Sequence, residues 1–242
     1  LIDRSTKSLA VTDRGMLFYK RSRKILDAVL ELEEALLDEN EIAEGRIHIS
    51  MPKVLLQSSV MKKLAEFFKQ YPDIKLDLTI SDSLESLIDQ GIDFAIRVGE
   101  LKDSRLHAKK IGKATTIFCA SPEYLATQPP INSFFDVVNH PLILPSYLNL
   151  SESILWKRFK QFSNLEQSHL VDDASALLQL VKEGVGVAFM LDVAAEEALA
   201  AGDVVRLFPE IALNSTDVSL VYLDRRYLPK RMLLFKEFMV SA

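Results

Sequence analysis

The chain has 242 residues, 48% of them hydrophobic, which is enough to bury a substantial core in one or two lobes. Its single cysteine, Cys119, rules out an internal disulfide, and its four scattered histidines give no metal-ligand spacing, so we expect no metal and no cofactor. The net charge of −5 conceals an asymmetry, because residues 1–24 carry +5, residues 25–44 carry −8 and the remainder is close to neutral.

The first twelve residues predict a cationic hairpin that leads into a helix. Two short apolar runs flank a polar tip, and Thr12 suits the N-cap of the following helix. A basic tip can contact a phosphate or enter a minor groove, which makes Arg4, Ser5 and Lys7 candidate DNA-binding residues. An ordinary solvated hairpin is the alternative, but the basic charge of this end of the chain favours nucleic acid.

A long helix is expected from about residue 13 to about residue 40, since no glycine follows Gly15 in it and no proline occurs before Pro52. Apolar residues recur along it at steps of seven, four, three and four, which is a heptad seam with a charged outer face. We interpret the seam as a dimerisation coiled coil; a single amphipathic helix packed on its own domain is the alternative. The seam residues are Phe18, Ile25, Val29, Leu32 and Leu36.

After Gly45 the hydrophobic pattern alternates between strands and helices, first as a β-α-β-α-β run and then, after a proline-rich stretch, in a similar second run. This alternation predicts an α/β fold of two successive lobes. Strands are expected at residues 46–50, 74–80, 94–96, 115–120, 142–144, 168–171, 185–190 and 218–223, and helices at residues 54–70, 84–90, 154–162, 174–182, 193–200 and 229–240.

No enzyme motif is complete. Gly184-Val185-Gly186 is only a fragment of a dinucleotide motif, no glycine-rich turn follows the first strand, and the nucleophile-elbow, zincin and Walker A motifs are absent. Asp172 and Asp173 are adjacent and would point to opposite sides of a strand, which argues against an acid–base pair. We therefore expect no catalytic residue and no enzymatic activity.

The apolar runs and the start of the chain also bear on localisation. No run approaches the roughly 18 apolar residues of a membrane span, and no export-signal pattern opens the chain. We expect a cytoplasmic protein with no membrane partner.

Several tracts resemble one known family, the LysR-type transcriptional regulators, near its CrgA-like branch. The wing-to-linker signature of that family is similar to this chain at Arg4, Leu9, Thr12 and Gly15. Its effector-domain signatures are similar to residues 67–73 (FFKQYPD), 91–99 (GIDFAIRVG) and 225–229 (RRYLP). The resemblance covers essentially the whole chain, and the motifs keep their order and spacing.

The resemblance implies a two-lobed, periplasmic-binding-protein-like (type II) effector domain with two crossing strands, preceded by a wing remnant and a long dimerisation linker helix. It implies that most of the winged helix-turn-helix domain, including the recognition helix, lies outside this chain. It also implies a homodimer or homotetramer that binds DNA under the control of a small-molecule effector. The boundaries we expect are a wing remnant at 1–12, a linker helix at 13–40, a hinge at 41–45 and an effector-binding domain at 46–242, with lobe I at 46–116 and 218–242 and lobe II at 117–217.

A solute-binding protein of the same bilobed class is the alternative function. Such a protein would need an export signal and would have no use for a cationic wing on a long helix. We therefore favour the regulator over the solute-binding protein.

An effector site is expected between the lobes, because ligands of such folds lie at the carboxyl ends of strands, where helix N-termini point. This chain departs from the family pattern at Val54, where many members have Ser or Thr to hold a carboxylate, and at Leu191, which replaces a usual proline. For Ser81, Ser83 and Ser175 the alternative is helix capping, and for Arg97 it is a pair with Asp93 or Glu100. The candidates are Met51, Lys53, Val54, Ser81, Ser83 and Arg97 from lobe I, and Ser146, Tyr147, Asp173 and Ser175 from lobe II.

Overall fold

The structure is a computed structural model whose contacts divide the chain into two compact units, residues 1–43 and residues 44–242. It describes residues 1–5, 8–12, 14–19, 21–22, 25–26, 29, 43–82, 91–99, 106–146, 168–211, 213–223 and 228–241.

The first unit opens with the hairpin that the sequence predicts. Strand β1 (Ile2–Ser5) pairs antiparallel with β2 (Ser8–Val11). Thr12 then caps a helix, because its Oγ1 accepts a hydrogen bond from the backbone N–H of Gly15 at 3.1 Å. The described residues from 14 to 29 are helical, and the rest of the helix expected up to residue 40 lies outside the described residues.

Lobe I, as we use the term, comprises in the described residues a sheet in the order β4-β3-β5-β11 with the helices α2 and α8. The first three strands are mutually parallel, and β11 runs antiparallel to β5. An aromatic cluster joins the helices to the sheet, since the Phe235 ring lies 5.1 Å from Phe67 and 4.9 Å from Phe94. The elements are β3 (Gly45–Met51), α2 (Ser59–Gln70), β4 (Ile74–Ile80), β5 (Phe94–Val98), β11 (Ser215–Leu223) and α8 (Lys230–Val240).

Lobe II has a sheet covered on both faces, as buried parallel strands require. On one face, Leu177 of α6 and Ala195 of α7 pack with Met190. On the other face, Tyr124 of α4 packs with Phe189. Phe189 and Met190 are adjacent on one strand, so their side chains point to opposite faces of the sheet. The elements are α4 (Pro122–Thr127), the 3-10 helix η2 (Phe134–Asn139), β7 (Leu142–Pro145), β8 (His169–Val171), α6 (Ala174–Lys182), β9 (Val187–Leu191), α7 (Asp192–Ala201) and β10 (Val205–Leu207).

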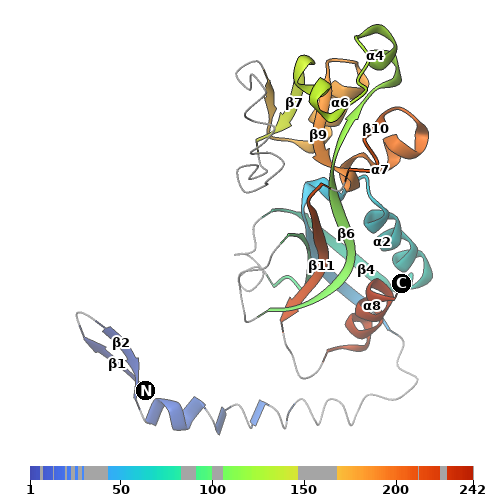
Figure 1. Cartoon of the computed structure of the whole chain (residues 1–242). Coiled ribbons are helices and arrows are strands. Elements are labelled where there is room, and N and C mark those ends of the chain that lie inside the picture. The colour runs from blue at the N-terminus through green and yellow to red at the C-terminus, as the bar shows by residue number, and fades with distance from the viewer. Residues whose placement is uncertain are drawn as a thin grey trace. The chain divides into compact units, whose positions relative to one another are not determined.

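One long strand passes from lobe I into lobe II and runs beside β11 in lobe I (Figure 1). Strand β6 (Leu106–Ala120) pairs with β11 in lobe I and, from Thr116 on, with β9 in lobe II. Together the described strands of this unit form a sheet in the order β4-β3-β5-β11-β6-β9-β7-β8, with β10 beside β6. The two-lobed α/β fold with crossing strands therefore agrees with the prediction.

The prediction was wrong about where the first helix of lobe I begins. Instead of a helix from Val54, Lys53–Leu55 forms a short 3-10 helix, η1, and α2 starts at Ser59. The break lies at Ser58, whose backbone is extended and whose Oγ donates to the Leu55 carbonyl at 2.7 Å.

The other described elements differ from the predictions mainly at their ends. Strand β6 begins at Leu106, nine residues before the predicted start at Thr115. Its first half is mostly polar and exposed, so the sequence pattern did not predict a strand there. The short elements α4, η2 and β10 were not predicted. The helices expected at residues 84–90 and 154–162 lie outside the described residues.

Candidate functional site

The carboxyl ends of the parallel strands in both lobes carry most of the candidate residues. In lobe I, η1 follows β3, and Ser81 follows β4. In lobe II, Ser146 follows β7 and α6 begins just after β8. One contact joins the two groups, because the Lys53 Nζ lies 2.6 Å from Oδ2 of Asp173.

Asp173 makes two interactions, one that caps α6 and one with Lys53. Its Oδ1 accepts a hydrogen bond from the backbone N–H of Ala176 at 2.8 Å and so caps α6. The hydrogen bond from Lys53, with the helix amides, lowers the pKa of Asp173, and the same bond raises the pKa of Lys53. The side chain of Asp173 is 25% exposed and that of Lys53 is 54% exposed, so solvent screens the pair and it adds little to the stability of the fold.

A second polar contact between the lobes lies at the start of α2. The backbone N–H of Ser59 donates to Oε2 of Glu196, on α7, at 2.9 Å. The side chain of Ser58 provides no cap, because its hydroxyl is bonded to Leu55. A carboxylate of lobe II therefore satisfies one of the free N–H groups at the start of a lobe I helix.

Apolar contacts accompany these polar ones. Val54 is partly buried and packs against the lobe II core that contains Leu177, whereas Met51 is completely buried. The valine side chain offers a ligand no hydrogen-bond donor, so at this position the side chain contributes packing alone.

Arg97 is almost fully buried, with 4% of its surface exposed. Its guanidinium donates to the Ser50 carbonyl at 3.1 Å and to Ser50 Oγ at 2.8 Å, which ties β5 to β3. Burial lowers the pKa of Arg97, and the charge of Asp82 acts in the opposite direction. The group remains a cation, because an arginine is protonated at any ordinary pH. The Asp93 carboxylate, considered above as a partner, accepts a hydrogen bond from the backbone N–H of His48 at 3.0 Å.

The remaining effector candidates are less closely gathered. Ser81 is bonded through its backbone N–H to the carbonyl of Met51 at 3.0 Å, and Ser146 in the same way to Val171 at 2.9 Å. Ser175 lies in the first turn of α6 and is half-buried. Ser83 and Tyr147 lie outside the described residues. Glu196 was not among the predicted site residues, since nothing in the local pattern of α7 signals a contact with another lobe.

The DNA-binding and dimerisation candidates lie in the first unit. Arg4 and Ser5 belong to β1, and Lys7 lies outside the described residues. Along the helix, Phe18, Ile25 and Val29 are 60%, 66% and 46% exposed within the single chain. Leu32 and Leu36 lie outside the described residues.

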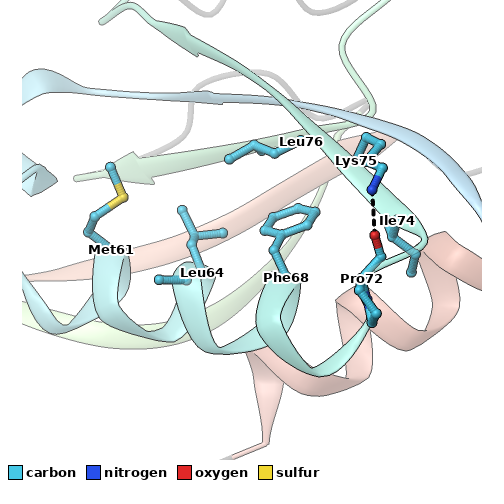
Figure 2. Close-up of a pocket in the computed structure, with 8 residues that line it drawn as sticks. Met61, Leu64, Phe68, Pro72, Ile74, Lys75 and Leu76 are labelled. Atoms are coloured by element: carbon cyan, nitrogen blue, oxygen red, sulfur yellow. Dashed lines mark hydrogen bonds between the residues drawn. The ribbon is translucent and has the colours of Figure 1, made fainter.

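A groove of about 380 Å³ lies on lobe I between α2 and β4 (Figure 2). The side chains of Met61, Leu64 and Phe68 reach from α2 toward Leu76, and the Lys75 ammonium closes one end by donating to the Pro72 carbonyl at 2.6 Å. None of the effector candidates lines this groove, and its apolar walls offer few orienting polar groups.

Two other kinds of site were sought in the described part of the chain. No group of three or more His, Cys, Asp or Glu side chains there lies close enough together to hold a metal ion. Within the same residues, no helix has the length and apolar character needed to cross a membrane.

Known proteins with similar sequences are transcriptional regulators. An uncharacterized HTH-type transcriptional regulator of Haemophilus influenzae is 29% identical over 233 residues, which cover 95% of this chain and 80% of that protein. The HTH-type transcriptional regulator CrgA of Neisseria meningitidis serogroup C is 28% identical over 248 residues, which cover 100% of this chain and 81% of CrgA.

Solved structures agree with this grouping. Full-length AphB, a virulence activator of Vibrio cholerae and a member of the LTTR family, has a TM-score of 0.66 at 28% identity over 99% of this chain and 83% of that one. The structure of N. meningitidis CrgA shares the fold, with a TM-score of 0.70 at 24% identity over 99% of this chain and 82% of that one. The family model for the LysR substrate binding domain matches residues 40–242. The chain therefore belongs to the LysR-type transcriptional regulators, whose regulatory domain has the periplasmic-binding-protein-like type II fold.

Proposed function

We propose that the chain is a transcriptional regulator whose DNA binding responds to a small molecule bound between lobe I and lobe II. The observation that carries this proposal is the ion pair of Lys53 with Asp173, which joins the two lobes at the carboxyl ends of their strands. Ligands of open α/β folds lie at such strand ends. Similar proteins are regulators and not enzymes, so we propose no catalytic role.

The effector site we propose combines a few hydrogen-bond donors with apolar contacts. Lys53 supplies an exposed cation, and Ser175 a hydroxyl at the start of α6. Val54 supplies apolar contact, and Arg97 acts as a buried positive charge that fixes the strand ends. The other residues we include are Met51, Ser81, Ser83, Ser146, Tyr147 and Asp173.

The first unit is assigned to DNA binding and self-association. We propose that Arg4, Ser5 and Lys7 contact the phosphate backbone or a minor groove, supported by the +5 charge of residues 1–24. A homodimer, or a homotetramer of two such dimers, brings two hairpins to one DNA duplex. We keep the boundaries stated above, with the effector-binding domain at residues 46–242.

A thermal-shift screen of small metabolites on the whole chain tests the effector site. Any compound that raises Tm is then titrated calorimetrically against the wild type and the Lys53→Met and Lys62→Met variants. We expect Lys53→Met to weaken binding by about tenfold, the effect of losing one charge-assisted contact. Lys62 is a matched control, because it is an exposed lysine of the same lobe whose partner Glu197 lies 3.5 Å away. Equal affinity in all three proteins would place the effector elsewhere.

A further inference from the structure

Lobe II contacts the start of η1 and α2 at three points, and a longer ion pair joins Lys62 of α2 to Glu197 of α7 at 3.5 Å. Lys53 pairs with Asp173 at 2.6 Å, Val54 packs against the lobe II core, and the Ser59 N–H donates to Glu196 at 2.9 Å. We call these five residues, Lys53, Val54, Ser59, Asp173 and Glu196, the inter-lobe clamp. Every contact of the clamp joins residues of different lobes, so separating the lobes breaks all three.

The three contacts differ in strength. The Lys53–Asp173 pair is partly exposed and contributes little by itself. The Glu196 contact matters more, because α2 has no side-chain cap of its own and no acidic residue in its first turn. Val54 adds an apolar anchor, since opening the lobes returns its side chain to water.

We propose that the inter-lobe clamp keeps the two lobes closed in the effector-free chain. The chain's own carboxylates and Val54 then set the equilibrium between open and closed lobes. This inference rests on the proposed function, because it concerns the same residues between the lobes. An effector that enters there acts by replacing clamp contacts with its own, and it shifts the lobes only by its different affinity for the two arrangements.

Hydrogen exchange of the whole chain, followed by mass spectrometry with no effector present, tests the clamp. In Glu196→Ala we expect the amides of residues 59–61 to exchange about fivefold to tenfold faster, as for a lost helix cap. We also expect faster exchange at residues 176–177 of α6, which lie at the other polar contact of the clamp. Adding Asp173→Asn, which keeps a helix-capping side chain on α6 but removes the charge, should increase exchange further at both places.

Asp203→Ala is the control, because it removes a carboxylate of lobe II whose partner, Lys182 at 2.6 Å, lies in the same lobe. It should leave both regions unchanged. Faster exchange confined to residues 59–61 would reduce Glu196 to a local cap and overturn the clamp, as would no change at all. If Glu196→Ala does not fold, Glu196→Gln gives the same comparison with a smaller expected increase. Because no effector is present, this outcome is independent of the metabolite screen.

Discussion

Gly186 has no side chain beyond a hydrogen atom, and this allows two segments of lobe II to approach each other closely. A Cβ at this position would lie 2.2 Å from the carbonyl oxygen of Pro141, the same oxygen that accepts a hydrogen bond from Val187 at 2.9 Å. Backbone atoms on both sides leave no flexible group to move. We expect Gly186→Ala to destabilise the protein by about 1–3 kcal/mol, as overpacked sites do, measured by chemical denaturation.

Gly112→Ala controls for the mere addition of a methyl group. A Cβ at Gly112 meets its nearest neighbour, Val218, at 3.8 Å, which is ordinary van der Waals contact. This variant should remain within about 0.5 kcal/mol of the wild type. Equal stability of the two variants would mean that the approach of Pro141 to Gly186 is not tight in solution.

His140 makes the stability of lobe II depend on pH. It is buried and bonded through Nδ1 to the Tyr124 hydroxyl at 2.9 Å. Burial lowers the pKa of His140, with the Asp136 charge partly opposing, so the folded state binds the proton less readily than the unfolded chain. Below the unfolded pKa of about 6.5, protonation therefore favours unfolding, and stability falls as the pH drops.

Thermal melting between pH 7.5 and pH 5 of the wild type and of His140→Gln isolates this group. Glutamine keeps a polar partner for Tyr124 but does not titrate. We expect the wild type to lose more stability than the variant across this range. Parallel curves would show that His140 has the same pKa in the folded and unfolded states.

Individual contacts of the candidate site were only partly predictable. Lys53 and Asp173 could be chosen because each closely follows the carboxyl end of a predicted strand, where ligands of such folds lie. The burial of Arg97 against Ser50 could not be read from the sequence, because the pairing of β3 with β5 joins residues 47 positions apart. The same limit hid Glu196, whose partner Ser59 lies 137 positions away.

Among the elements, α8 packs on lobe I although it lies far along the chain from the other lobe I helix, α2. Phe235 on this helix is completely buried between Phe67 and Phe94. We expect Phe235→Ala to cost about 3–5 kcal/mol of unfolding free energy, since it removes a large side chain from a packed core.

Leu233→Ala provides the comparison on the same helix. Leu233 is 39% exposed, so its truncation should cost less than about 1 kcal/mol. Denaturant titration of both variants checks the difference. Similar losses in the two would mean that α8 is not anchored on lobe I through Phe235.

Elements with a clear hydrophobic period were predictable, and elements set by tertiary contacts were not. The strand at Ile74–Ile80 and the helix at Ala174–Lys182 have the predicted bounds. The 3-10 helix η1 was hidden, because its residues continue the apolar pattern of α2 and only the short segment 56–58, which ends at the extended backbone of Ser58, separates the two. The exposed half of β6 has no apolar run, and its pairing with β11 makes it a strand.

At the scale of the whole molecule, the order of the two lobes followed from the alternation of strands and helices, whereas the self-association of the chain stays a prediction from the heptad seam. Phe18, Ile25 and Val29 expose between 46% and 66% of their surface within a single chain, which is unfavourable for apolar side chains on one helix. A partner helix packed on the seam would bury them.

Ile25 and Leu26 offer a matched test, because they are adjacent on this helix, are 66% and 58% exposed, and only Ile25 lies on the predicted seam. We expect Ile25→Lys to raise the dissociation constant of the oligomer by about tenfold or more, since a charge is buried in a coiled-coil interface. Leu26→Lys should leave the dissociation constant nearly unchanged. Sedimentation velocity over a range of concentrations measures both. A larger effect at Leu26 would mean that the seam is assigned to the wrong face, and a wild type that sediments as a monomer would exclude the coiled coil.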